Sequence, residues 1–397
     1  MKGVGGDFWV NRPRREALYG ALWLLVRGRR KVSGQEYCAV PYSPDLLPDI
    51  AQLMVYLWGG DPEANTSYFR WKYERNPHSD EPLAVVGLRG SKVVGFRGFF
   101  ATKWTAGRDQ TVRVLCPSDT CVHPDHRRRG LSVLMGRAAM RLYEGRYPIF
   151  LNTSCSHQSL PGYVRMGFLP LAQRNYLAKV RLSAFFSSLP VLSPVSRILR
   201  GQGPSQAQGL RLPLGGALEF LVTDRVLPEE MAGVVAKRGR NPARLTLCQD
   251  EAYFRWRFAS GRRRYSFCYL MEGQKVAGYA ALRLFRRGRA TIIDYGGVDE
   301  NCTKTLLGAA VATLRLDVLS IWDFSVESSL RQYLSSLGFR RDSLTAFIEK
   351  RLWGEVSLPL LVRPVAESFR EDDWYIGGLD VRRIESWLIR EICSDAA

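Results

Sequence analysis

The residues best suited to chemistry in this sequence lie in one segment, positions 122–132, which reads Val-His-Pro-Asp-His-Arg-Arg-Arg-Gly-Leu-Ser. We expect a β-strand to end at Val122, because Pro124 cannot continue it, and a helix to begin just after Gly130. The first N–H groups of a helix have no partners within it, and the helix dipole adds positive potential there. Glycine permits close backbone approach, and arginines bind phosphate through paired hydrogen bonds. The segment therefore predicts a site for a diphosphate group.

The spacing of this segment is similar to a known family pattern. V-x-P-x-x-R-x-x-G-x-small, with Arg127, Gly130 and Ser132 at the three defining positions, resembles motif A of the GNAT superfamily of acyl-CoA-dependent N-acyltransferases. Ser132 stands where Gly or Ala is usual, and a small residue still fits. The resemblance implies binding of the pyrophosphate and pantetheine of an acyl-CoA, without a metal, by Val122, Arg127, Arg128, Arg129, Gly130, Leu131 and Ser132. The alternative is a basic loop that opens an ordinary helix.

The resemblance extends to two more residues, which lie further along the chain. Asn152 ends the next expected strand, where the family splays two parallel strands, and the resemblance implies that it hydrogen-bonds the pantetheine arm. Tyr163 belongs to Gly-Tyr-Val-Arg-Met-Gly-Phe at 162–168, similar to the family's helix end with a tyrosine near the CoA sulfur. Tyr163 is thereby expected to act as the general acid for the departing thiolate, since a phenol can supply a proton as charge develops. A tyrosine that only packs in the core is the alternative.

A general base must remove a proton from the attacking amine. Asp119, three residues before Val122 on the same expected strand, is our candidate, and His157 is the second. Asp119 could equally satisfy backbone groups.

The elements that position these residues occur twice in the chain. The hexapeptide at 68–73, Tyr-Phe-Arg-Trp-Lys-Tyr, recurs at 253–258 as Tyr-Phe-Arg-Trp-Arg-Phe. Further matches follow in the same order, at 92–96 with 275–279 and at 166–168 with 337–339. We therefore predict two versions of one fold.

Hydrophobic alternation and turn residues predict the same order of elements in both copies. The expected strands of the first copy are Leu83–Leu88, Val93–Ala101, Arg113–Val122 and Ile149–Asn152, with a helix at Leu131–Glu144. Those of the second are Tyr265–Met271, Val276–Leu284, Ala290–Val298 and Val318–Phe324, with a helix at Lys304–Leu314. Antiparallel strands that lead into a β-α-β-α tail give a mixed α/β fold of two tandem GNAT-like domains.

The second copy differs at the cofactor loop. Val298–Lys304 lacks the arginine cluster and the glycine and carries two carboxylates instead. Tyr333 lies five residues before Gly338, whereas Tyr163 lies four before Gly167, which is about 100° of helical rotation. We expect this half not to bind CoA but to bind the acceptor or form one wall of its cleft.

The expected organisation has four parts. Residues 1–34 form a basic amphipathic segment that lies either on the protein or on an anionic membrane face. Residues 35–180 form the GNAT domain with the acyl-CoA site, 181–214 an apolar connector rich in Pro and Gly, and 215–397 the second GNAT-like domain. No apolar run reaches the roughly 18 residues of a membrane span. We expect a cytoplasmic protein, with peripheral contact at the inner membrane face left open.

Charge and cysteine usage narrow the partners. Lys and Arg number 57 against 38 Asp and Glu, and a net charge of +19 favours anionic partners. Zinc-finger spacing, RNA-binding aromatic signatures and long basic tails are all missing, so we do not expect nucleic acid. The eight cysteines stand singly, without a CxxC pair, and are expected to be reduced thiols rather than disulfides or metal ligands.

These patterns together predict an acyl-CoA-dependent N-acyltransferase, with acetyl-CoA or another acyl-CoA as co-substrate and a primary amine as acceptor. The tandem arrangement and the late Asp373-Trp374-Tyr375 and Asp380 resemble bacterial acetyltransferases of polysaccharide assembly, which implies a nucleotide- or lipid-linked amino sugar. Two alternatives stay open: a Fem-type aminoacyl transferase of peptidoglycan assembly, and a non-catalytic acyl-CoA-binding protein.

Overall fold

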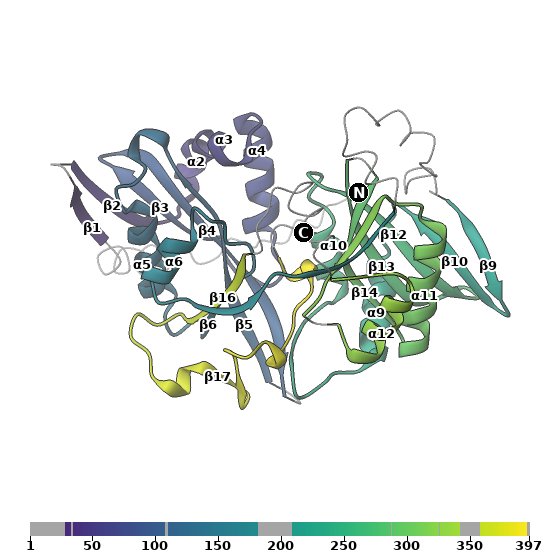
Figure 1. Ribbon diagram of the computed structural model, residues 1–397. Helices are drawn as coiled ribbons and strands as arrows, with labels where there is room; N and C mark the ends of the chain where they lie inside the picture. The colour runs from purple at the N-terminus through teal and green to yellow at the C-terminus, as the bar shows by residue number, and fades with distance from the viewer. Residues whose placement is uncertain are drawn as a thin grey trace, which may run out of the picture.

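The computed structural model describes residues 28–32, 35–107, 110–181, 209–286, 288–324, 326–341 and 358–394. Most of the expected N-terminal segment, 1–34, and most of the expected connector, 181–214, lie outside these residues. Two mixed sheets lie side by side, each with helices packed on it (Figure 1). Among the described helices, none is both long and apolar enough to cross a bilayer.

The first sheet carries the predicted cofactor loop. Its main path follows the order β1 (Gly28–Val32), β2 (Gln35–Pro41), β3 (Leu83–Arg89), β4 (Lys92–Ala106), β5 (Gln110–Val122), β6 (Ile149–Asn152), β16 (Pro359–Pro364) and β7 (Leu169–Gln173). One face is covered by α5 (Leu131–Tyr143) and α6 (Leu160–Arg165). The other is covered by α2 (Leu47–Leu53), α3 (Val55–Trp58), α4 (Pro62–Phe69) and the π-helical turn Arg70–Glu74. The loop thus has a different helical layer on each side of its sheet.

The second sheet repeats this plan. Its order is β8 (Tyr176–Val180), β15 (Val318–Trp322), β14 (Arg289–Gly297), β13 (Lys275–Phe285), β12 (Arg264–Glu272), β10 (Leu218–Thr223) and β9 (Arg211–Gly215). The helices of this half are α9 (Pro228–Arg238), α10 (Glu251–Arg257), α11 (Glu300–Thr313) and α12 (Ser328–Ser336). The predicted mixed α/β fold is confirmed.

The two halves exchange strands, which the sequence analysis did not predict. β8 is the last strand of the first half in sequence but pairs antiparallel with β15 of the second sheet, with Val180 opposite Val318. Conversely, β16 comes from the second half and pairs with both β6 and β7. Figure 1 shows it in yellow-green next to β6. Each sheet is therefore completed by a strand from the other half, so the halves depend on each other for their cores.

The repeated hexapeptides meet at the junction of the halves. The indole Nε1 of Trp71 donates to the carbonyl oxygen of Trp256 at 2.7 Å, and that of Trp256 donates to the carbonyl oxygen of Trp71 at 2.8 Å. The two rings are stacked, with centroids 5.4 Å apart and planes 16° from parallel. This reciprocal contact gives a physical reason for the same aromatic sequence in both copies.

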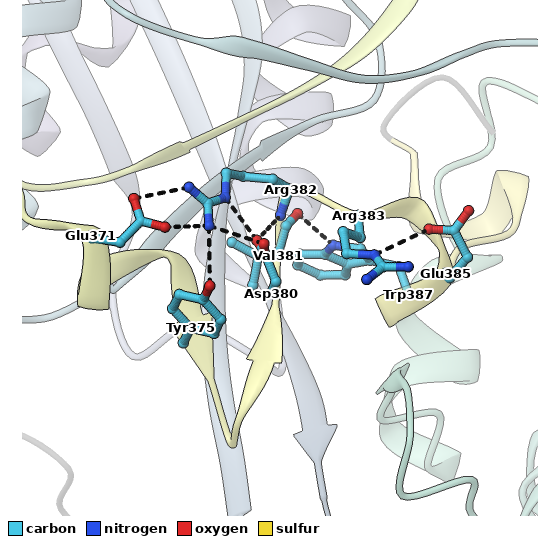
Figure 2. A network of polar contacts seen from close by, with 8 residues as sticks. All are labelled: Glu371, Tyr375, Asp380, Val381, Arg382, Arg383, Glu385 and Trp387. Carbon is cyan, nitrogen blue, oxygen red and sulfur yellow. Dashed lines mark hydrogen bonds and ion pairs between the residues drawn. The ribbon is translucent and has the colours of Figure 1, made fainter.

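The C-terminal segment ties the second half to the first. Arg382 binds Asp380 and Glu371 through its guanidinium and reaches the hydroxyl of Tyr375, as Figure 2 shows. Trp387 donates from Nε1 to the carbonyl of Val381 at 2.9 Å (Figure 2). Its ring packs edge-on against Trp104 of β4, with centroids 5.1 Å apart. Two short strands, β19 (Trp387–Leu388) and β11 (Leu245–Leu247), continue this contact onto β4.

Candidate functional site

The predicted anion loop forms a strand-loop-helix unit with an open helix end. β5 ends at Val122, a short helical turn spans Pro124–His126, and α5 begins at Leu131. Gly130 is the N-cap with φ 74°, and no described side chain caps the helix. Arg128, with φ 61°, is the non-glycine residue of the described chain with a positive φ. The first N–H groups of α5 are thus left for an external anion, as the diphosphate prediction requires.

The arginines of the loop lie around this helix end. Arg127 donates from Nε to the carbonyl oxygen of Val122 at 3.1 Å, and Arg129 donates from Nη1 to the hydroxyl of Tyr37 at 3.0 Å. The same hydroxyl is 3.0 Å from Nδ1 of His126. Partial burial and the nearby positive charges lower the pKa of His126, so the arginines supply the positive charge of the loop at neutral pH.

The neighbouring strands β5 and β6 diverge toward the end of the sheet that carries the loop. Within the described chain they pair in parallel at Leu115 and Phe150 alone. Asn152 at the end of β6 is buried; its Oδ1 accepts from the backbone N–H of Ser154 at 3.0 Å, while its Nδ2 has no partner among the described residues. A buried donor without a partner is costly, and a ligand carbonyl would satisfy it. The residues therefore fit an amide-bearing arm such as pantetheine.

Tyr163 lies in α6 on the same face of the sheet as α5. Its side chain is buried and packs edge-on against Phe168, with ring centroids 4.9 Å apart. The guanidinium carbon of Arg97 lies 4.8 Å from the centroid of the Tyr163 ring. Arg97 also donates from Nη1 to the carbonyl and the hydroxyl of Ser132, each at 3.2 Å. One buried arginine on β4 thus joins the loop to the predicted acid.

Arg97 is not among the site residues predicted from the sequence. The available signal was an arginine inside the apolar stretch Lys92–Ala106, where a charge is unexpected. Strand alternation alone did not indicate what this side chain would contact.

Asp119 lies on the opposite face of the sheet, against the turn Arg70–Glu74. Its Oδ2 accepts from Lys72 Nζ at 2.7 Å and from the Tyr73 hydroxyl at 2.6 Å. Burial alone would raise the pKa of Asp119, but the charge and hydrogen bond of Lys72, with the Tyr73 bond, lower it overall. Asp119 is therefore a paired carboxylate and a weaker proton acceptor than an ordinary aspartate. His157, the second candidate, is exposed in the loop after β6.

We predict that Lys72→Met destabilises the protein by about 3–5 kcal/mol, because it leaves the buried Asp119 carboxylate without its counter-ion. Denaturant unfolding near neutral pH measures the effect. Arg113→Met is the control: it removes an exposed ion pair with Asp80 and should cost less than about 1 kcal/mol.

The same variant has an expected pH dependence. The pKa of Asp119 is lower in the folded protein than in the unfolded chain. The ion pair with Lys72 therefore stabilises the fold fully above the ordinary aspartate pKa, and this stabilisation is lost as the pH falls through the lowered pKa of the folded state. The difference between wild type and Lys72→Met should thus narrow in acid. A constant difference down to the acid transition would contradict the ion pair.

The corresponding loop of the second half is closed. Asp299 is the N-cap of α11, and its carboxylate accepts from the backbone N–H of Cys302 at 2.6 Å. A Cβ added to the preceding Gly297 would lie 2.6 Å from the backbone nitrogen of Thr303. The position that corresponds to Gly130 is therefore occupied by a residue whose carboxylate repels a diphosphate. The carboxylate also binds a first-turn N–H group that a diphosphate would need.

The second half has a counterpart of Asp119 that is also held by hydrogen bonds, namely Asp294. Asp294 lies three residues before the end of β14, as Asp119 does on β5. It is buried and accepts from Arg390 Nη1 at 2.8 Å, from the Tyr279 hydroxyl at 2.7 Å and from Gln249 Nε2 at 2.6 Å. Because Arg390 belongs to the C-terminal segment, the tail fills this side of the second sheet.

We predict that Lys304→Glu leaves CoA affinity within about twofold of wild type, because Lys304 pairs with Glu300 at 2.6 Å, away from the α5 loop. Calorimetric titration with CoA measures this. Arg129→Glu is the comparison, because it places a negative charge in the α5 loop and should abolish CoA binding. An equally large loss in Lys304→Glu would show that both halves bind the cofactor.

A groove of about 890 Å³ lies between the repeated helices. Its lining includes Trp71, Trp256, Tyr68, Arg75, Arg255 and Arg262. Arg262 stacks over the Tyr68 ring at 4.3 Å and donates to Asn65 Oδ1 at 2.7 Å. Both halves thus line a cavity with aromatic and basic walls, next to the turn that holds Lys72.

Comparison with known proteins agrees with this geometry. The family model described as "Acetyltransferase (GNAT) domain" matches residues 41–170, which contain the loop, Asn152 and Tyr163. No protein of curated function matches the sequence. The match supports the acetyltransferase (GNAT) domain that the resemblance implied, over residues 41–170.

Solved structures give the likeness in fold. A conserved protein of unknown function from Enterococcus faecalis, described as a probable N-acyltransferase, has 8% identity and a TM-score of 0.56 over 83% of this chain and 73% of its own. A GCN5-related N-acetyltransferase from Anabaena variabilis has 12% identity and a TM-score of 0.48 over 83% and 73%. A tandem GNAT protein from the clavulanic acid biosynthesis pathway has 12% identity and a TM-score of 0.47 over 84% and 100%. The first of these shows a shared fold.

Proposed function

We propose that the protein transfers an acyl group, preferentially acetyl, from acyl-CoA to a primary amine. The observation that carries this proposal is the uncapped N-terminus of α5 behind an arginine loop, inside the segment that matches an acetyltransferase domain. The contrast with α11, whose first turn is capped by Asp299, supports a cofactor site in the first half and not in the second.

The cofactor would be held along the α5 and α6 face. The first N–H groups of α5 and the side chains of Arg127, Arg128 and Arg129 would bind the diphosphate. The Nδ2 of Asn152 would donate to a pantetheine carbonyl. The acyl thioester would then lie where β5 and β6 separate, close to Tyr163.

The transfer needs two proton movements, one from the attacking nitrogen and one to the departing sulfur. The amine nitrogen attacks the thioester carbonyl carbon, a C–N bond forms and the C–S bond breaks. The nitrogen loses a proton and the sulfur gains one from the Tyr163 hydroxyl. Asp119, on the face opposite Tyr163, is the proposed proton acceptor. Its lowered pKa makes it a weak base, and a weak base suffices because the nitrogen becomes positively charged, and therefore acidic, once it has attacked the carbonyl.

The acceptor would approach from the α4 face. The groove between the halves has aromatic rings that suit a sugar or a base and arginines that suit a phosphate. An amino sugar linked to a nucleotide or a lipid, as used in surface polysaccharide assembly, fits this lining and the net charge of +19. We infer a cytoplasmic enzyme whose basic surface allows peripheral contact with the inner membrane face.

The test combines binding with turnover. Calorimetry should detect CoA in the micromolar range, roughly 1–100 μM. Acetyl-CoA should then be consumed with a panel of primary amines that includes UDP-linked and lipid-linked amino sugars. CoA binding without turnover on any amine would indicate a binding protein, and aminoacyl-tRNA turnover without CoA binding would indicate a Fem-type enzyme.

A further inference from the structure

We propose that Arg97 is a positioning residue that makes Tyr163 a stronger acid, through the positive charge that it holds over the Tyr163 ring. The inference rests on the proposed acyl transfer. It explains how the buried phenol of Tyr163 can give its proton to the leaving thiolate.

The burial of Arg97 is the first observation. Its side chain is 2% exposed, on the middle strand β4 under the start of α5. Among the described residues no carboxylate lies within ion-pair distance of it, and its Nε has no hydrogen-bond partner. A guanidinium remains protonated, and a buried charge without a counter-ion costs several kcal/mol. Such a group is expected where a negative charge develops during function.

The contacts of Arg97 show where that negative charge would develop. Its guanidinium lies between the first turn of α5, where Ser132 accepts two hydrogen bonds, and the face of the Tyr163 ring. Gly136 leaves room for Met166 next to the guanidinium: a Cβ there would lie 2.4 Å from Met166 Sδ, and at an ordinary contact distance of 3.5 Å from the guanidinium carbon of Arg97. The extra oxygen of Ser132, where Gly or Ala is usual, gives the arginine a second acceptor.

The energetic consequence follows from the electrostatics of the ring. A cation over an aromatic face interacts more strongly with the electron-rich phenolate than with the phenol. The low dielectric of the interior increases this difference. The charge therefore offsets the burial that disfavours the phenolate, and proton transfer to the leaving thiolate becomes easier.

Two substitutions separate charge from hydrogen bonding. Arg97→Gln keeps a donor for Ser132 and removes the charge, whereas Arg97→Lys keeps both a donor and a charge. Arg257→Met is the matched control, since it removes another buried arginine, one that donates to the Ser394 carbonyl in the second half.

The primary measurement needs no turnover. Tyrosine labelled with ¹³C at Cζ reports ionisation in the full chain by NMR, and Tyr163→Phe assigns the resonance. We expect the titration midpoint of Tyr163 to rise by about one pH unit or more in Arg97→Gln, and to stay near wild type in Arg97→Lys and Arg257→Met. An unchanged midpoint in Arg97→Gln, or a Tyr163 that does not titrate while the wild type is folded, would overturn the proposal. Neither outcome depends on the acceptor, so failure here is distinct from failure of the proposed function.

Kinetics with a shortened thioester provide the second test. S-acetyl-N-acetylcysteamine has the reacting end of acetyl-CoA but no phosphates. Arg97→Gln should lower kcat/KM by roughly tenfold or more with both acyl donors. A loss confined to acetyl-CoA would instead mean that Arg97 only holds α5 for the diphosphate, and would overturn the role at Tyr163.

Discussion

Gly130→Asp should abolish CoA binding in a protein that remains folded. The new carboxylate would lie at the N-cap of α5 and face the diphosphate with like charge. Two like charges about 4 Å apart near a protein surface cost about 4 kcal/mol, which is roughly a thousandfold in Kd. The substitution therefore places at α5 a carboxylate like the one that Asp299 provides at the start of α11. Calorimetric titration with CoA measures the loss.

The control for this variant separates backbone strain from charge. Gly273, in the turn between β12 and β13, has φ 59°, and nothing lies within 4 Å of a Cβ placed there. Gly273→Asp carries the same left-handed strain and the same charge but should bind CoA like wild type. Unchanged CoA affinity in a folded Gly130→Asp protein would rule out the loop as the diphosphate site.

Tyr163→Phe should lower turnover by roughly 10²-fold or more while CoA affinity stays within a few-fold. The ring keeps its packing against Phe168 and its contact with Arg97, and only the proton donor is lost. Because that interaction is made chiefly in the transition state, kcat and kcat/KM should fall together. Steady-state rates and a melting temperature for the same preparation measure both effects.

Tyr333→Phe is the matched control in the second half. Tyr333 lies in α12, which corresponds to α6, and its hydroxyl would lie 2.3 Å from a Cβ added to Gly308. We expect its loss to change stability but not turnover. A wild-type kcat for Tyr163→Phe on the true acceptor would show that Tyr163 is not the general acid. Water would then be the source of the proton for the leaving thiolate.

The sequence determined the local parts of the site because their signals are local. The strand end at Val122, the break at Pro124 and the helix start after Gly130 all depend on neighbouring residues, and the structure has them at those positions. Repetition at 68–73 and 253–258 predicted two related halves, since the same aromatic pattern buries the same faces. The carboxylates of Val298–Lys304 likewise predicted a second loop unlike the first, and Asp299 caps α11.

The tertiary structure decided which distant residues meet. Strand exchange could not be predicted, because the sequences of β8 and β16 indicate strands but not their partners, and the choice of partner depends on the assembled core. The pairing of Asp119 with Lys72 joins β5 to a turn 47 residues away in the sequence, and it lowers the pKa of the proposed base. Arg97 gave no signal beyond an unexpected charge; only the packing of α5 and α6 over β4 puts its guanidinium on the Tyr163 ring. Spacing along the chain fixes which residues share an element, whereas protonation and partner choice depend on burial and on charges brought close by folding.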